Sequence, residues 1–87
     1  MSVNWFPGGR RNKDFEVERG EMAGGYEFSL CRADTRFPDE FKFRLFVYRA
    51  ENAGGGFLHV GGFNTIDDAK LAAENWTDPY PIAGGSH

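Results

Sequence analysis

Two segments of the chain, residues 41–49 and 57–63, carry cationic, aromatic and imidazole side chains at alternate positions. Successive side chains of a strand point to opposite faces, so each set would share one face if the segments are neighbouring strands. A sheet face that combines cations with aromatic rings is typical of nucleic-acid recognition by stacking and phosphate contact. The predicted sheet-face site consists of Lys42, Arg44, Phe46, Tyr48, Phe57 and His59.

The alternative is that the N-terminal residues cover this face. Trp5 and Phe6 would then fold back over the aromatic side chains, and the cations would only solvate the rim. A wholly exposed aromatic patch is unusual on a small monomer. The sequence leaves both interpretations open.

A second candidate site lies on the predicted C-terminal helix. Leu71 falls among polar residues on the helical wheel and is expected to face solvent, where the neighbouring acidic side chains would form a protein-binding ridge with it. The alternative is that Leu71 is one of the scattered exposed leucines that most proteins carry. The predicted helix site consists of Asp67, Asp68, Leu71 and Glu74.

Strand alternation places Cys31 and His59 on the same outer face of the predicted sheet. A thiol and an imidazole are the two groups that a thiolate–imidazole nucleophile combines. Their strands need not be adjacent, however, and no orienting Asn or Asp is evident. The acidic residues lack metal-ligand spacing, and neither a phosphate-loop motif nor a nucleophile elbow is present. We therefore expect a nonenzymatic protein without metal or cofactor.

The charge distribution separates the two halves of this 87-residue chain, whose formal net charge is −3. Residues 51–87 hold Lys70 as their only cation among five acidic residues. An acidic chain is a poor nonspecific nucleic-acid binder, because displacing counterions from phosphates needs several uncompensated cations. The single cysteine and the lack of a signal-like or membrane-spanning apolar run predict a cytoplasmic protein with no membrane partner.

The apolar pattern predicts four strands and one helix. Apolar residues alternate with polar ones over residues 15–19, 26–31 and 41–49, and a fourth strand over 57–63 is interrupted by Gly61 and Gly62. The core face is expected to carry Tyr26, Phe28, Leu30, Phe41, Phe43, Leu45, Val47, Leu58 and Val60.

Thr65 stands where a helix N-cap belongs, and the helix is expected to run from Ile66 to Asn75 or Trp76 before Pro79 and Pro81 prevent its continuation. Steps of about 100° place Ile66, Ala69, Ala73 and Trp76 on the stripe that would cover the sheet.

These elements predict an α+β fold: a four-stranded antiparallel meander with one C-terminal helix packed on one face. The expected organisation is a flexible arm at residues 1–14, a single α+β domain at 15–78 and a mobile tail at 79–87. The two open edges of such a sheet could pair across a twofold axis to give a homodimer.

Residues 58–69 read Leu-His-Val-Gly-Gly-Phe-Asn-Thr-Ile-Asp-Asp-Ala. This run resembles the strand-Gly-x-Phe-x-Thr-helix element of the plant ethylene-response-factor DNA-binding domain, and it is similar to integrase N-terminal domains and many small phage proteins. In the plant family, the sheet face away from the helix enters the DNA major groove. The matching face here would show Lys42, Arg44, Phe46 and Tyr48.

The functional expectation is a small nonenzymatic protein-binding module. Compact, acidic proteins with few motifs resemble phage or mobile-element inhibitors, including anti-CRISPR proteins, which often occupy the nucleic-acid-binding surfaces of their targets. The alternative is a nucleic-acid-binding domain that uses the basic and aromatic sheet face.

Overall fold

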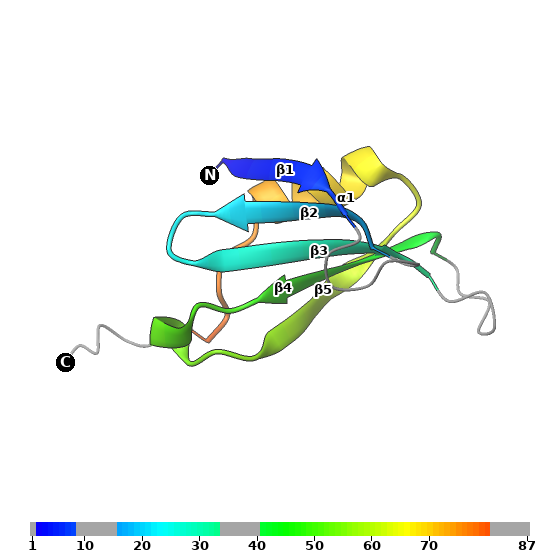
Figure 1. The fold of residues 1–87 in the computed structure, drawn as a ribbon. Coiled ribbons are helices and arrows are strands. Elements are labelled where there is room, and N and C mark those ends of the chain that lie inside the picture. The colour runs from blue at the N-terminus through cyan, green and yellow to red at the C-terminus, as the bar shows by residue number, and fades with distance from the viewer. Residues whose placement is uncertain (1, 9–15, 34–40, 81–87) are drawn as a thin grey trace.

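A computed structural model describes residues 2–8, 16–33 and 41–80. It contains one antiparallel sheet in which each strand pairs with the next along the chain, and a helix, α1, that lies across one face (Figure 1). The α+β class, the antiparallel sheet and the single C-terminal helix are confirmed. The elements are β1 Val3–Pro7, β2 Glu16–Met22, β3 Tyr26–Arg32, β4 Phe43–Tyr48, the short 3-10 helix η1 Glu51–Ala53, β5 Phe57–Phe63 and α1 Ile66–Glu74.

The sheet has five strands, so the prediction of four was wrong. The additional strand, β1, consists of residues 3–7, which the sequence analysis placed in a flexible arm. The pattern missed β1 because it is short, ends on Pro7 and is followed by two glycines, which are typical of a loop. Residues 9–14 of the predicted arm and residues 81–87 of the predicted tail lie outside the described residues.

A glycine in β2 makes room for β1. Gly20 pairs with Trp5, and a Cβ atom added at Gly20 would lie 2.6 Å from Val3 Cγ1 and 2.9 Å from Trp5 Cζ3. The predicted strand stopped at residue 19, just before this glycine, but β2 continues to Met22. Gly20 is therefore a packing residue inside a strand, where it lets an indole ring lie directly on the backbone.

The core lies between the sheet and α1, as the alternation predicted. Phe28, Leu30, Leu45 and Val47 are fully buried, and Ala69 presents a small surface that lets α1 approach the sheet closely. Trp76, just beyond the helix, packs edge-on against Phe28, with ring centroids 5.7 Å apart. Tyr26, Phe43, Leu58, Val60 and Ile66 are partly buried against this core.

Phe41 departs from the predicted core. It precedes β4, is 41% exposed, and its ring lies so close to Gly62 that a Cβ there would meet it at 2.3 Å. Gly62 pairs with Arg44, whose side chain points away from the helix, so Phe41 lies on that side too. Strand parity failed at Phe41 because the strand begins only at Phe43.

The start of α1 is confirmed. The Thr65 hydroxyl accepts a hydrogen bond from the amide of Asp68 at 3.1 Å, which satisfies one of the free donors of the first turn. The predicted contact stripe is buried at Ala69 and Ala73 and partly buried at Ile66. None of the helices in the described part of the chain is long and apolar enough to cross a membrane.

Candidate functional site

The face of the sheet away from α1, here called the outer face, carries a cluster of rings on β4 and β5. The register pairs Tyr48 with Phe57 and Phe46 with His59. Ring centroids are 5.8 Å apart for Tyr48 and Phe57, 6.1 Å for Phe46 and Phe57, and 5.2 Å for Phe46 and His59. These distances are those of interacting aromatic pairs. The cluster is called the aromatic strip and consists of Phe46, Tyr48, Phe57 and His59.

The two predicted cations lie on or just before β4. Arg44 lies on the same face of β4, and its guanidinium Nη1 is 3.4 Å from Nε2 of His59. Lys42 stands just before β4 and is exposed. The structure thus places five of the six predicted sheet-face residues on one face of two neighbouring strands, with Lys42 just before the start of β4.

The described N-terminal residues do not cover the strip. Trp5 packs on the helix side of the sheet, where its ring centroid is 6.3 Å from that of Phe28 and 5.4 Å from Nζ of Lys70. Phe6 points to the outer face but lies on β1, at the opposite edge of the sheet from β5. Phe57 is 61% exposed, so much of the strip is open to solvent.

The other half of the outer face holds a polar cluster that the sequence did not predict. Arg19 is buried and forms ion pairs with Glu27 and, at 3.9 Å, with Glu21. The hydroxyl of Ser29, also buried, donates a hydrogen bond to the carboxylate of Glu16. The outer face therefore combines carboxylates on β2 and β3 with the aromatic strip and Arg44 on β4 and β5.

Cys31 belongs to the edge of this polar cluster. Its cross-strand neighbours are Glu16 and Arg44, whereas His59 pairs with Phe46, so the predicted thiolate–imidazole pair is not formed by the register. Burial raises the pKa of the Cys31 thiol; the Ser29 hydroxyl, 3.4 Å from the sulfur, lowers it, and the charge of Glu16 raises it. The net shift disfavours the thiolate that a nucleophile would need.

The residues of the predicted helix site separate into two groups. Asp67, Asp68 and Leu71 are exposed along α1, and Leu71 is 61% exposed. Glu74 is half-buried, and its Oε2 accepts a hydrogen bond from the backbone N–H of Val3 at 3.2 Å. Glu74 therefore has a structural contact, because it fastens the end of α1 to β1. Within the described residues, no group of three or more His, Cys, Asp or Glu side chains could hold a metal ion.

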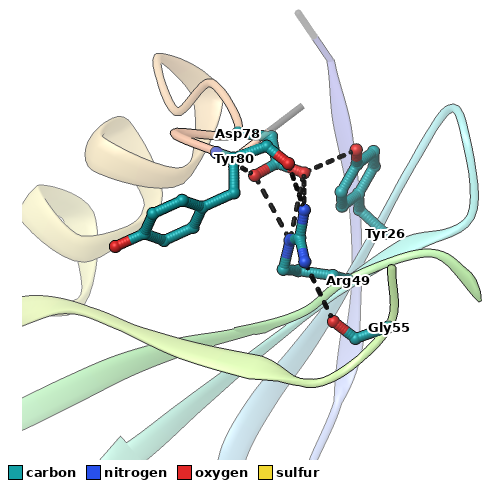
Figure 2. A network of polar contacts seen from close by, with 5 residues as sticks. All are labelled: Tyr26, Arg49, Gly55, Asp78 and Tyr80. Atoms are coloured by element: carbon teal, nitrogen blue, oxygen red, sulfur yellow. Dashed lines mark hydrogen bonds and ion pairs between the residues drawn. The ribbon is translucent and has the colours of Figure 1, made fainter. Parts of the chain in front are cut away.

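A buried ion pair joins the chain after α1 to the start of the β4–β5 connection (Figure 2). The guanidinium of Arg49 contacts the carboxylate of Asp78 through Nε at 3.2 and 3.1 Å and through Nη2 at 3.1 Å. The Tyr26 hydroxyl donates to the same carboxylate at 3.0 Å, and the amide of Tyr80 does so at 2.8 Å. This set is called the C-terminal network and consists of Tyr26, Arg49, Asp78 and Tyr80, with the Gly55 carbonyl accepting from Arg49.

The network alters the pKa of two of its members. Burial alone would raise the pKa of Asp78, but hydrogen bonds from Tyr80, Arg49 and Tyr26, together with the charge of Arg49, lower it overall. Burial raises the pKa of Tyr26, and the hydrogen bond to Asp78 raises it further. Both shifts favour the pair as drawn, an ionised Asp78 and a protonated Tyr26.

These shifts predict how stability depends on pH. The folded pKa of Asp78 lies below its unfolded value of about 3.9, so the carboxylate stabilises the fold above that value. This stability is lost as the pH falls through the folded pKa. As the pH is lowered below about 4, we expect the urea midpoint of the wild type to decrease more steeply than that of Asp78→Asn. Asp67→Asn, which removes an exposed carboxylate, should keep the wild-type profile; equal profiles for wild type and Asp78→Asn would contradict the assignment.

Comparison of the chain with family models, with curated proteins and with solved structures gives no significant match.

Proposed function

We propose that this protein is a protein-binding module whose principal contact surface is the aromatic strip. The observation that supports it is the packing of four rings against one another, tilted or edge-to-face, on the face away from α1, with Phe57 61% exposed. Protein interfaces are enriched in aromatic residues and Arg, and such residues supply most of the binding energy. Arg44 at the border of the strip fits this composition.

The charges of the outer face favour a protein over a nucleic acid. Arg44 is the cation beside the strip and Lys42 stands just before β4, while Glu16, Glu21 and Glu27 outnumber Arg19 on the neighbouring strands of the same face. A phosphate backbone would meet these carboxylates as it followed the sheet, and each repulsion would reduce affinity. A folded protein partner can instead bury the rings and leave the carboxylates at the rim.

The finer proposal concerns the kind of partner. Asp67 and Asp68 are exposed at the start of α1, on the opposite layer from the strip, and they give this end of the molecule negative charge. A nucleic-acid-handling protein presents a basic surface that such carboxylates would complement. We therefore propose inhibition of such a protein, the activity that phage and mobile-element inhibitors, including anti-CRISPR proteins, exert.

The strip is tested by Phe57→Ser, with Leu71→Ser as a matched control because both side chains are 61% exposed. Both variants and the wild type serve as bait in a lysate of the source organism, and the affinity of the recovered partner is measured by calorimetry. We expect Phe57→Ser to weaken binding about thirtyfold, the effect of losing an interface hot spot of about 2 kcal/mol. Leu71→Ser should bind as the wild type does. A partner that binds all three proteins equally would contradict the proposal.

The nucleic-acid alternative has its own measurement. Labelled single-stranded DNA and RNA are titrated with the protein at low salt, and we expect no saturable binding. Affinity that falls steeply with salt, with a shallower slope in Arg44→Ala, would overturn the protein-binding proposal in favour of phosphate contacts on the outer face.

A further inference from the structure

The strand β5 is an edge strand with outward-facing backbone groups. At the hairpin end, the amide of Arg49 donates to the carbonyl of Gly56 at 2.8 Å. In an antiparallel ladder, hydrogen-bonded residue pairs alternate with pairs that are not hydrogen-bonded. Two residues along from Gly56, Leu58 therefore directs its N–H and C=O groups toward β4. Phe57 and His59 belong to the other kind of pair, so their N–H and C=O groups point toward the free edge. Within the described residues, no further strand pairs with that edge.

The two edges of the sheet differ in how they are protected. The other edge, β1, has five residues and ends on Pro7, which cannot donate to a ladder. β5 has seven residues without a Lys, Arg, Asp, Glu or Pro, the residues that usually block strand addition. The irregularity in its pairing falls at Val60, beyond the two outward-facing residues. The stretch from Phe57 to His59 is therefore a regular, uncharged edge.

A groove of about 360 Å³ lies between β5 and the segment that follows α1. Three consecutive residues of β5 line it, and two of them, Leu58 and Val60, pack toward the helix layer, so the groove lies beside β5 on that side of the sheet. Its opposite wall is the segment after α1, which the C-terminal network holds to Arg49. The lining residues are Leu58, His59, Val60, Trp76, Thr77, Pro79 and Tyr80.

Charge and polarity specify what this groove would accept. Leu58, Val60, Trp76 and Pro79 give the groove apolar surface and none of its lining residues is Lys, Arg, Asp or Glu, so it would accept uncharged side chains with apolar parts. On the outer face, the guanidinium of Arg44 lies 3.4 Å from the ring of His59. An acidic side chain on an added strand opposite His59 would lie near this cation.

We propose that the free edge of β5 is a binding site for an extended peptide segment of a partner protein, added as a sixth strand. The outward N–H and C=O groups of Phe57 and His59 pair with the peptide backbone. Apolar side chains at alternate peptide positions enter the groove, and an acidic side chain between them faces Arg44. This site is separate from the aromatic strip, which is formed by side chains rather than by the strand edge.

The probe is a phage-displayed library of random peptides of about ten residues, selected on the full-length protein. We expect enriched peptides to carry apolar residues at alternate positions with an acidic residue between them. On binding of a synthesised enriched peptide, the amides of Phe57 and His59 should exchange with deuterium at least tenfold more slowly, because they become hydrogen-bonded.

Two variants test this binding site, and a third variant is the control. Thr77→Trp fills the groove from an exposed position, and His59→Pro removes an outward N–H; each should weaken peptide binding at least tenfold. Asn52→Ser, which changes an exposed side chain of η1 outside both the groove and the strip, should bind the peptide normally. Peptide binding that survives both Thr77→Trp and His59→Pro, or selection without enrichment, would overturn the proposal. Self-association that protects the two amides without peptide would assign the edge to a second copy.

Discussion

Asp78→Ala is expected to lower the free energy of unfolding by about 2–3 kcal/mol, the effect of removing charged hydrogen bonds from a covered site. The carboxylate is 7% exposed and satisfies donors from Arg49, Tyr26 and Tyr80. Its removal leaves the guanidinium of Arg49, which is 11% exposed, without its counter-ion. Urea unfolding at pH 7 measures the loss.

The matched control is Asp68→Ala, which removes an exposed carboxylate from the start of α1. It should cost less than about 1 kcal/mol, since its contribution is limited to the helix dipole. A double-mutant cycle with Arg49→Met separates the pair from other effects. If Asp78→Ala and Asp68→Ala lose the same stability, the C-terminal network is not the contact that holds the segment after α1.

Gly20→Ala is expected to destabilise the protein by about 2 kcal/mol and to loosen β1, as overpacking of a closed site does. The added Cβ would lie 2.6 Å from Val3 and 2.9 Å from the ring of Trp5, so β1 must shift. The sign of this change in unfolding free energy is informative, because Gly→Ala within an unconstrained strand normally stabilises a protein by about 0.5–1 kcal/mol. Unfolding measurements give the loss, and Trp5 fluorescence together with amide exchange across β1 locates it.

Gly61→Ala is the corresponding control in β5. Its added Cβ would approach Cζ of Phe63 at 3.3 Å, a contact with the far end of a side chain that can move slightly. We expect its effect to be at least 1 kcal/mol smaller than that of Gly20→Ala. Equal losses, or normal exchange protection in β1 of Gly20→Ala, would contradict the role assigned to Gly20.

The two proposed binding surfaces share one strand. The side chains of Phe57 and His59 contribute to the aromatic strip, while their backbone groups form the free edge of β5. A partner that adds a strand to this edge would therefore also lie beside the strip, and its outward side chains could contact the rings.

Local patterns were sufficient for the central strands and the helix. Alternation over residues 26–31 and 41–49 predicted the buried faces of β3 and β4, apart from Phe41, because burial of one face of a strand imposes a period of two. Thr65 predicted the start of α1, because an N-cap acts on an amide only three residues away. The same parity placed Arg44, Phe46 and Tyr48 together on the outer face.

Long-range contacts decided the remaining features. β1 forms because Trp5 fits over Gly20, and its end is held by Glu74, 71 residues from Val3. Asp78 pairs with Arg49 across 29 residues, and Phe41 lies against Gly62.

The amino-acid sequence by itself determined the central strands, the helix and which of their side chains share a face, since these depend on neighbours within a few positions. The tertiary structure decided the fifth strand, the ion pair after α1 and the open edge beside its groove. Each of those features requires segments distant in the chain to meet, and only the packed fold brings them together.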